Sequence, residues 1–553
     1  MTLHPFLTPR CPSHIIASMK ILSAAEMRQV DRLTAESYGV PGLMLMENAA
    51  ARTVEAIEKR LGPVADKRAL IICGKGNNGG DGAAIARQLW VKGGLADVLL
   101  LGRIDETRGD ARVNFEIIRS LSSSNPALRV VEIEGVDNLL RETALLSPDL
   151  FIDAIFGTGL TRAAGGLFAE AIRYFNNLGR GSAVVAVDIP SGLASDSEHL
   201  IGPAVRARLT VSFTAPKVAN VLPPARDYNG DLVIASIGSP GELIDASGSR
   251  LNLVTRETVK RGLDASRLDS FANKGDAGKV LVVAGSRGKT GAACLVGEGA
   301  MRAGAGLVTV ATAQSAQPVI ASRMIVECMS EALAETAAGS ISREATARIL
   351  ELAGERDVIA IGPGLGSSEE STRSLVRSLV TGRARPAVLD ADALNSLAPW
   401  PEEIRGSADL PLVLTPHPGE MARLVEKSIP QVAGDRVGVA REFATAHGVI
   451  VVLKGSRTCI ASPCGEVYVN PTGNAGMATG GTGDVLTGII AGLLAQKPDD
   501  PLAATIAAVY LHGLAGDIAA SLKGTRAMIA SDIAAHLGDA FIEVGGDQER
   551  FVG

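Results

Sequence analysis

The chain alternates between two spacings of hydrophobic residues. Short runs of Val, Ile and Leu, bounded by glycine or polar residues, separate longer stretches in which apolar residues return every three or four positions. The short runs are typical of strands buried on both faces, and the longer stretches are typical of amphipathic helices. Because strands that alternate with helices predict parallel sheets covered by helices on both faces, we expect an α/β protein.

This alternation occurs twice along the chain. In the first half it follows a helical segment, Ser23 to Ala56, and the expected elements are strands 69–73, 96–101, 128–132, 149–153 and 182–187 and helices 81–92, 109–121 and 167–177. In the second half the expected elements are strands near 280–284, 306–311, 357–361, 386–390, 411–415 and 449–454 and long apolar helices near 291–303 and 484–495. Each half therefore predicts a sheet of its own.

The boundary between the halves is expected near residue 250. The pattern weakens around 240–265 into Gly, Ser, Asp and Asn, and a chain of 553 residues is too long for a single core. We expect a first domain over 19–245 and a second over 252–545. Residues 1–18 lack the apolar core of a secretory signal, and we expect a disordered extension before a more natural start at Met19.

Composition and charge narrow the expected partners. The chain is 46% hydrophobic, with 62 glycines and only 3% aromatic residues, which is typical of tightly packed α/β enzymes. The formal charge of −6, without a block of Lys and Arg, argues against nucleic acid, and the lack of a long uncharged apolar run argues against a membrane span. The six cysteines show no metal-ligand spacing, which favours a reducing cytoplasm. We therefore expect small-molecule ligands.

A glycine-rich loop follows the first expected strand. The glycines between Gly74 and Gly79 match the dinucleotide-binding fingerprint, but Gly102 and Arg103 stand where a Rossmann fold would place an acidic residue. The carboxylate of Asp81 would also repel a pyrophosphate at the start of the helix. Carboxamide and carboxylate oxygens on a tight loop instead suit a hard cation, or the hydroxyl and amide groups of a neutral ring.

Two more loops leave strand ends in the same half. One begins at Asp153, and the other begins at Asp188 and carries Ser191. Because the carboxyl ends of parallel strands face one crevice, these side chains can converge with Asn78 and Asp81. Any one of these loops is more simply explained as a tight turn with a helix-capping aspartate, whereas the three together favour a binding site.

A second glycine-rich loop, Gly480 to Asp484, precedes an apolar helix near the end of the chain. Its N–H groups can form an anion site, and Asp484 can take a proton from an attacking hydroxyl, which suits phosphoryl transfer. Asp484 could instead simply cap the helix, but a cap needs no run of glycines. The Gly285–Thr290 loop is not a P-loop, because Val283 stands where the first glycine belongs.

Other polar loops in the second half would line the same crevice. They follow expected strands at 361–366, 389–395, 415–420 and 453–458. His417 lies in the third loop, where it could simply be hydrogen-bonded between two prolines. We interpret His512 as a core histidine and Lys289 as a solvated residue.

These motifs resemble those of a known family. The three loops of the first half, with Asn77-Asn78-Gly79-Gly80-Asp81-Gly82 and Thr214-Ala215-Pro216-Lys217, closely resemble the epimerase domain of the bifunctional NAD(P)H-hydrate repair enzymes over roughly 20–240. Residues 255–540, from Asn273-Lys274-Gly275-Asp276 through Thr415-Pro416-His417-Pro418-Gly419-Glu420 to Asp484, resemble their dehydratase domain. The resemblance implies an N-terminal Rossmann-like three-layer α/β/α domain and a C-terminal ribokinase-like α/β/α domain.

The resemblance also implies roles for particular residues. In the first half, Asp188 would be the acid or base, and the hydrate-binding residues would be Asn77, Asn78, Gly79, Gly80, Asp81, Gly157, Thr158, Gly159, Leu160, Thr161, Arg162, Ala163 and Asp188. Potassium would be bound by Asn78, Asp153 and Ser191. In the second half, Asp484 would be the base, and the hydrate would contact Ala292 or Ala293, Gly364, Gly366, His417 and Asp484. The nucleotide would be bound by Lys454, Gly455, Ser456, Arg457, Thr458 and Gly483.

The implied chemistry is the repair of hydrated nicotinamide cofactors. Phosphorylation of the hydrate's hydroxyl turns a poor leaving group into a good one, so the ring nitrogen can expel it and restore NADH or NADPH. By similarity we expect ADP with Mg²⁺ as donor, the hydrates of both cofactors as substrates and a homo-oligomer. The alternative from another class is a ribokinase-like kinase of a small alcohol or vitamin precursor, fused to a non-catalytic ligand-binding module.

Overall fold

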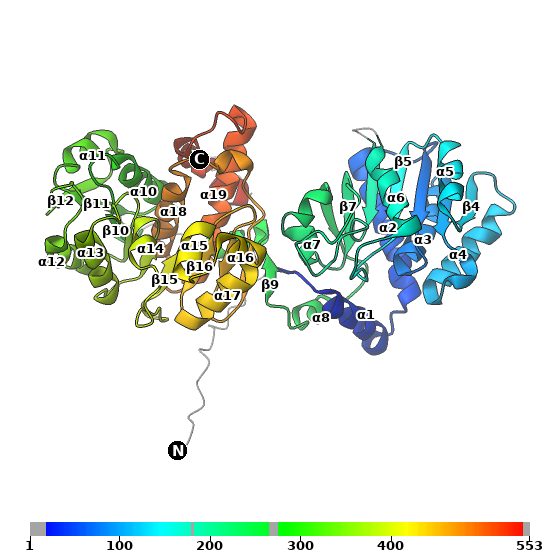
Figure 1. Cartoon of the computed structure of the whole chain (residues 1–553), viewed down its shortest axis with the longest axis horizontal. Helices are drawn as coiled ribbons and strands as arrows, with labels where there is room; N and C mark the ends of the chain where they lie inside the picture. Colours follow the sequence, from blue (N-terminus) through cyan, green and yellow to red (C-terminus); the bar gives the residue numbers. More distant parts are fainter. Residues whose placement is uncertain (1–17, 179–181, 265–274, 546–553) are drawn as a thin grey trace, which may run out of the picture. The chain divides into compact units, whose positions relative to one another are not determined.

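The chain forms two compact units, each with its own sheet (Figure 1). The computed structural model describes residues 18–178, 182–264 and 275–545, and the units divide between Ser249 and Arg250. Residues 1–17, in the expected extension, and the motif residues Asn273 and Lys274 lie outside the described residues. Both sheets are largely parallel and covered by helices, so the predicted α/β class is confirmed.

The first unit contains a fully parallel seven-stranded sheet in the order β4-β3-β2-β5-β6-β7-β8. Its strands are β2 (Arg68–Cys73), β3 (Leu95–Leu101), β4 (Leu128–Ile133), β5 (Leu150–Ala154), β6 (Ala183–Val187), β7 (Leu209–Phe213) and β8 (Asp231–Ala235). From β2 the chain first builds one edge of the sheet and then crosses to β5 and builds the other. The topological switch point therefore lies between β2 and β5, where ligands bind in open α/β sheets.

Helices cover both faces of this sheet. They are α1 (Ala24–Tyr38), α2 (Gly42–Leu61), α3 (Asn77–Val91), α4 (Gly109–Ser122), α5 (Val136–Ala144), α6 (Gly166–Asn177), α7 (Val218–Val221) and α8 (Gly241–Asp245). One hydrophobic core packs α2, α3 and α4 against the sheet face that carries Ile71. The other packs α5 and α6 against the opposite face, which carries Leu70 and Ile72. Because successive strand residues point to opposite faces, one strand supplies both cores and the unit has three layers.

The second unit contains an eleven-stranded sheet in the order β1-β9-β18-β17-β16-β15-β14-β13-β10-β11-β12. The strands are β1 (Met19–Lys20), β9 (Leu251–Leu253), β10 (Lys279–Val283), β11 (Leu307–Ala313), β12 (Met329–Leu333), β13 (Val358–Ile361), β14 (Ala387–Leu389), β15 (Leu412–Leu414), β16 (Ile450–Leu453), β17 (Cys459–Ala461) and β18 (Val467–Val469). Among the described pairings from β9 across to β12, the two made by β17 are antiparallel and the others are parallel. Strand order reverses between β10 and β13, which places a second switch point there.

Helices flank this sheet as well, with α10 and α18 on one side and α12 and α13 on the other (Figure 1). They are α9 (Arg256–Asp264), α10 (Thr290–Arg302), α11 (Gln317–Arg323), α12 (Thr346–Gly354), α13 (Glu370–Thr381), α14 (Asp392–Ser396), α15 (Pro418–Leu424), α16 (Ile429–Gly434), α17 (Arg436–His447), α18 (Thr482–Gln496), α19 (Pro501–Lys523), α20 (Ala530–Ala535) and α21 (Leu537–Gly545). By length and composition α19 alone among the described helices could cross a membrane, but 78% of its apolar window is buried inside the unit.

Helices α10 and α18 meet backbone to backbone. A Cβ atom on Gly488 would lie 2.2 Å from the carbonyl oxygen of Val296, and one on Gly299 would lie 2.5 Å from that of Val485. Any side chain at either position would force the helices apart, since real Cβ atoms do not approach that closely. This contact fixes the position of α18, whose first turn carries Asp484.

The observed elements differ from the expected ones in informative places. Helix α3 begins at Asn77 rather than at residue 81, so the Asn-Asn-Gly-Gly segment forms its first turn instead of a loop. Glycine is a poor helix former, which hides this turn from a sequence pattern. Seven of the observed strands, β1, β7, β8, β9, β12, β17 and β18, were not among the expected elements.

Candidate active sites of the two units

In the first unit, the loops after β2 and β5 meet at the switch point. The chain turns sharply at Gly74, and a Cβ on Gly79 would lie 1.8 Å from the Gly74 carbonyl oxygen, so only glycine fits there. This close turn places the N-terminus of α3 beside the end of β5. Asn78, in the first turn of α3, is 8% exposed, and neither its amide oxygen nor its amide nitrogen has a hydrogen-bond partner among the described residues.

Asp153, in β5, and Ser191, after β6, form a buried pair. The Ser191 hydroxyl donates to Asp153 Oδ1 at 2.5 Å, and the Ser191 N–H donates to Oδ2 at 2.8 Å. Burial raises the pKa of Asp153 to about 6, although the hydrogen bonds from Ser191 oppose the rise. A Cβ on Gly157 would lie 3.5 Å from the Asn78 side chain, which places the loop after β5 against the same amide.

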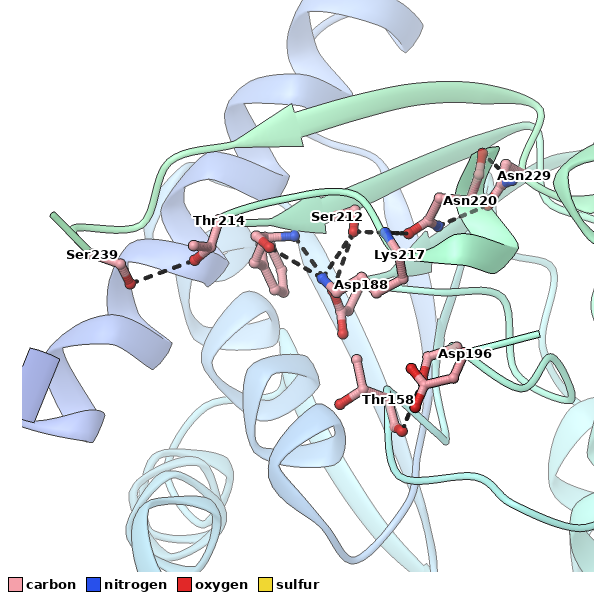
Figure 2. Close-up of polar contacts among 11 residues, drawn as sticks. Thr158, Asp188, Asp196, Ser212, Thr214, Lys217, Asn220, Asn229 and Ser239 are labelled. Carbon is pink, nitrogen blue, oxygen red and sulfur yellow. Dashed lines mark hydrogen bonds and ion pairs between the residues drawn. The ribbon is translucent and has the colours of Figure 1, made fainter. Parts of the chain in front are cut away.

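Asp188 lies at the end of β6 and is anchored through one oxygen (Figure 2). Its Oδ1 accepts hydrogen bonds from Lys217 Nζ at 2.5 Å, the Phe213 N–H at 3.3 Å and the Ser212 hydroxyl at 3.3 Å. Its backbone is left-handed, with φ of 65°, a strained conformation for aspartate that is common at functional sites. Asp188 is 13% exposed, whereas the Lys217 side chain is only 1% exposed.

Two further carboxyl groups interact electrostatically with Asp188. Asp81 is half-buried, and desolvation together with the charges of Asp188 and Asp31 raises its pKa well above the usual value. Desolvation also raises the pKa of Asp31 to about 6, against the lowering effect of Lys217. No role was expected for Asp31, yet it follows Met27 by one helical turn on the core-facing side of α1. The sequence signal that could have identified Asp31 was an acidic residue at helical spacing among the apolar residues of α1.

The remaining predicted hydrate-binding residues lie on one loop. Gly157 and Thr158 are half-buried, and the Thr158 carbonyl oxygen accepts a hydrogen bond from Ser195 at 3.2 Å. Gly159 is exposed, and the rest of the loop, Thr161 to Ala163, is exposed as well. Figure 2 shows Thr158 and Asp196 on the side of Asp188 away from Lys217 and Ser212. This loop therefore forms a rim beside the buried carboxylates.

In the second unit, the glycine-rich loop before α18 forms the centre of the candidate site. Gly481 caps the helix with φ of 92°, a left-handed conformation that glycine adopts without strain. Burial raises the pKa of Asp484, in the first turn, to about 6; the charge of Asp390 raises it further and that of Lys454 lowers it. The Thr482 hydroxyl is buried without a hydrogen-bond partner, so polar groups here remain available to a ligand.

Lys454 lies over the first turn of α18. Its Nζ is 2.7 Å from Asp390 Oδ1, and a Cβ on Gly483 would lie 3.2 Å from that nitrogen. Burial alone would lower the Lys454 pKa, but the charges of Asp390 and Glu420 outweigh burial and raise it. The second Asp390 oxygen accepts a hydrogen bond from the Thr487 hydroxyl at 2.9 Å. A buried carboxylate therefore holds an ammonium group at the N-terminus of a helix, where anions bind.

Hydrogen bonds from Arg436 hold the loop from Lys454 to Thr458 in place. The Arg436 guanidinium donates to the carbonyl oxygens of Ser456 at 2.6 Å, Arg457 at 2.9 Å and Leu453 at 3.4 Å. Since the guanidinium fork has a fixed geometry, these bonds hold one loop conformation. Five of the six predicted nucleotide-binding residues, Lys454 to Thr458, thus lie on a preorganised loop, and the sixth, Gly483, lies in the first turn of α18.

Four of the predicted hydrate-binding residues of this unit, Ala292, Ala293, Gly364 and Gly366, lie on the segments that follow β10 and β13, whereas His417 follows β15 and Asp484 lies in α18. The Gly285 N–H donates to the Pro363 carbonyl oxygen at 2.8 Å, which ties the two loops together. A side chain on Gly364 would contact Ala292, which is half-buried, whereas Ala293 is fully buried beneath. The Gly366 N–H donates to Asp392 Oδ2 at 2.8 Å. Of the two alanines, Ala292 is the one that a ligand can reach.

The structure shows the exposure and the polar contacts of His417, His512 and Lys289. His417 caps α15, where its Nδ1 accepts from the N–H groups of Gly419 and Glu420, and its side chain is 51% exposed. His512 is buried, as expected for a core residue, and burial lowers its pKa to about 4. Lys289, which we interpreted as solvated, is 53% exposed, but its Nζ also lies 3.2 Å from Asp392.

Comparison with known proteins agrees with this two-site arrangement. A family model described as YjeF-related protein N-terminus matches residues 42–219, and one described as NAD(P)H-hydrate dehydratase matches 280–538. The bifunctional NAD(P)H-hydrate repair enzyme of Moorella thermoacetica is 46% identical over 517 residues, covering 93% of this chain and 95% of that protein. The chain belongs to the family of bifunctional NAD(P)H-hydrate repair enzymes. The Escherichia coli member is 34% identical over 515 residues, which is 92% of each chain.

A solved structure also matches the second unit. The NAD(P)H-hydrate dehydratase of Bacillus subtilis, described as ADP/ATP-dependent and co-crystallised with ATP and Mg²⁺, is 32% identical. It covers 52% of this chain and 97% of its own, with a TM-score of 0.45. The family membership does not favour the alternative of a small-alcohol kinase fused to a non-catalytic module.

Proposed function

We propose that the chain repairs hydrated NADH and NADPH with two separate active sites. The first unit interconverts the R and S hydrates, and the second dehydrates the S form at the expense of a nucleoside diphosphate. The observation that carries this proposal is the pairing, in each unit, of a half-buried carboxyl group of raised pKa with a glycine-rich helix N-terminus. Perturbed carboxyl groups in a ligand-sized crevice are typical of acid–base catalysis.

In the first unit, epimerisation needs an acid and a base near one carbon. The hydrate carries its hydroxyl on the carbon next to the ring nitrogen, so inverting that carbon requires the C–O bond to break with loss of water and to re-form on the other face by addition of water. Asp81, whose raised pKa favours the protonated carboxyl, is suited to donate a proton to the departing hydroxyl oxygen. Asp188, which is paired with Lys217, is suited to accept a proton from the returning water, because groups whose environments differ can divide the two tasks.

A potassium ion would fit beside these carboxyl groups. Asn78 offers an unpartnered amide oxygen, and Asp153 is a buried carboxylate with no neutralising cation among its hydrogen-bond partners. Oxygen donors of this kind suit a hard cation. Asn78, Asp153 and Ser191 would hold the ion, which would supply a fixed positive charge at the base of the pocket.

In the second unit, Asp484 would take the proton of the hydrate's hydroxyl as that oxygen attacks the terminal phosphate. Amide groups around Gly483, together with the Lys454 ammonium, would stabilise the charge of the migrating phosphoryl group. The phosphorylated hydroxyl then leaves as phosphate when the ring nitrogen supplies its electron pair. By family resemblance we propose ADP as donor, and Mg²⁺ bound with it would offset the charge of its phosphates.

One incubation tests both activities. A mixture of R and S hydrates is supplied with ADP and Mg²⁺, and recovery of NADH is followed by its absorbance. Complete conversion indicates both activities, whereas conversion of only the S share indicates the second alone. Replacing ADP by ATP tests the donor, since activity with ATP only would refute ADP. We further propose that the chain is cytoplasmic and forms a homo-oligomer. Sedimentation of the purified chain would test the oligomeric state.

A further inference from the structure

The buried lysine of the first unit has no role in the chemistry described so far. Lys217 stands on the loop after β7, and its side chain is 1% exposed. A buried ammonium is costly unless it is paired and fully hydrogen-bonded. All three of its N–H groups are used: they reach Asp188 Oδ1, the Ser212 hydroxyl at 3.0 Å and the Phe213 carbonyl oxygen at 3.1 Å. Lys217 therefore has no proton free for a substrate.

The loop that carries Lys217 is held by a chain of buried amides (Figure 2). The Asn220 amide oxygen accepts from the Lys217 N–H at 2.9 Å, and the Asn220 amide nitrogen donates to Asn229 at 3.1 Å. Asn229 in turn donates to three backbone carbonyl oxygens, and both asparagines are buried. Because both asparagine side chains are hydrogen-bonded, the network fixes the Lys217 ammonium group in one place.

This arrangement anchors Asp188 asymmetrically. Among the described residues, every hydrogen bond to its carboxylate goes to Oδ1, and none goes to Oδ2. In Figure 2 the second oxygen points away from Lys217 and Ser212, toward the side where Thr158 lies. The left-handed backbone of Asp188 requires compensation, and the ion pair on Oδ1 supplies it.

We infer that Lys217 is a positioning residue for epimerisation: it clamps one oxygen of Asp188 so that the other faces the hydroxylated carbon of the bound hydrate. This inference rests on the proposed epimerase activity of the first unit. It predicts that loss of the ammonium lowers the rate of proton transfer, while the affinity for the hydrate, which Lys217 does not touch, stays nearly constant.

The test compares Lys217→Met, Lys217→Arg and the exposed control Lys59→Met in the full-length chain. Racemisation of separated hydrate epimers gives kcat and KM, and ADP-dependent dehydration of the S hydrate by the second unit reports on the integrity of the same preparation. For Lys217→Met we expect kcat to fall about 100-fold with KM changed less than about threefold, because a misplaced catalytic group costs roughly that factor. Lys217→Arg, which keeps the charge, should recover part of kcat.

The pH profile adds a second readout. Lys217 lowers the pKa values of Asp31 and Asp81. Because Asp81 is the proposed proton donor, the alkaline side of the epimerisation profile should move to higher pH in Lys217→Met. An unchanged kcat, or a loss expressed only in KM, would overturn the inference. If Lys217→Met does not fold, Ser212→Ala decides the matter: a fall in its kcat supports the clamp, and an unchanged kcat refutes it. Absence of epimerisation in the unaltered chain would instead refute the proposed function.

Discussion

Substituting Asp484 should remove dehydration and at the same time stabilise the second unit. Burial raises the pKa of Asp484 from 3.8 to about 6, which means that the folded protein holds this proton more tightly than the unfolded chain does. Stability therefore falls as pH rises through the window between these two values, and it stays reduced at neutral pH. Asp484→Asn removes the ionisable group and with it this penalty.

The size of the effect follows from the shift. A difference of about 2.2 units corresponds to roughly 3 kcal/mol at 1.36 kcal/mol per unit. Because the side chain is partly exposed, solvent screening reduces this, and we expect about 1 to 3 kcal/mol of added stability at pH 7. The gain should nearly vanish at pH 3, where the carboxyl group is protonated in the folded state and largely so in the unfolded state.

Denaturant unfolding at both pH values, beside the exposed control Asp409→Asn, measures the gain. ADP-dependent recovery of NADH should fall at least about 1,000-fold in the same variant, as expected for loss of a general base. A variant that is both inactive and less stable at pH 7 would show that Asp484 is a structural cap. A variant that stays active would refute its role as the base.

Three further outcomes follow from the two sites. The rate of dehydration should fall about tenfold between pH 7 and pH 5, since a base of pKa about 6 is mostly protonated at the lower pH, and Lys454→Met should move this fall to higher pH because Lys454 lowers the Asp484 pKa. Epimerisation should depend on potassium in the unaltered chain and lose that dependence in Asn78→Ala, measured as rate against KCl at constant ionic strength. Gly488→Ala should destabilise the second unit by about 1 to 3 kcal/mol, read from its unfolding midpoint, because its Cβ would lie 2.2 Å from a carbonyl oxygen; an unchanged midpoint would mean that α10 and α18 can separate freely.

The repeated alternation of strands and helices was enough to predict the class of both sheets. Strand β2 and helix α10 lie almost where the pattern placed them, because each has a long apolar run or a helical period. The order of strands was not predictable in this way, since it depends on pairing between distant segments such as β10 and β13. Helix α3 began early because its glycine-rich first turn is set by a close approach to Gly74 rather than by helix propensity.

Site residues on glycine-rich loops were visible in the sequence, whereas their supporting partners were not. Asp484 and Asn78 stand in motifs, but Asp31 stands in a helix and joins the first site only through folding. Lys217 and Asp390 were quoted within motifs without a role, because their significance depends on an ion pair with a residue far along the chain. Sequence patterns can identify residues in local motifs, whereas ion pairs between residues far apart in the chain become visible only in the folded structure.

The buried amide of Asn78 bears on how the first unit selects a ligand. Among the described residues, neither its oxygen nor its nitrogen has a hydrogen-bond partner. Since a buried polar group without a partner costs free energy, a ligand that offers this amide both a donor and an acceptor should bind more tightly than one that offers neither.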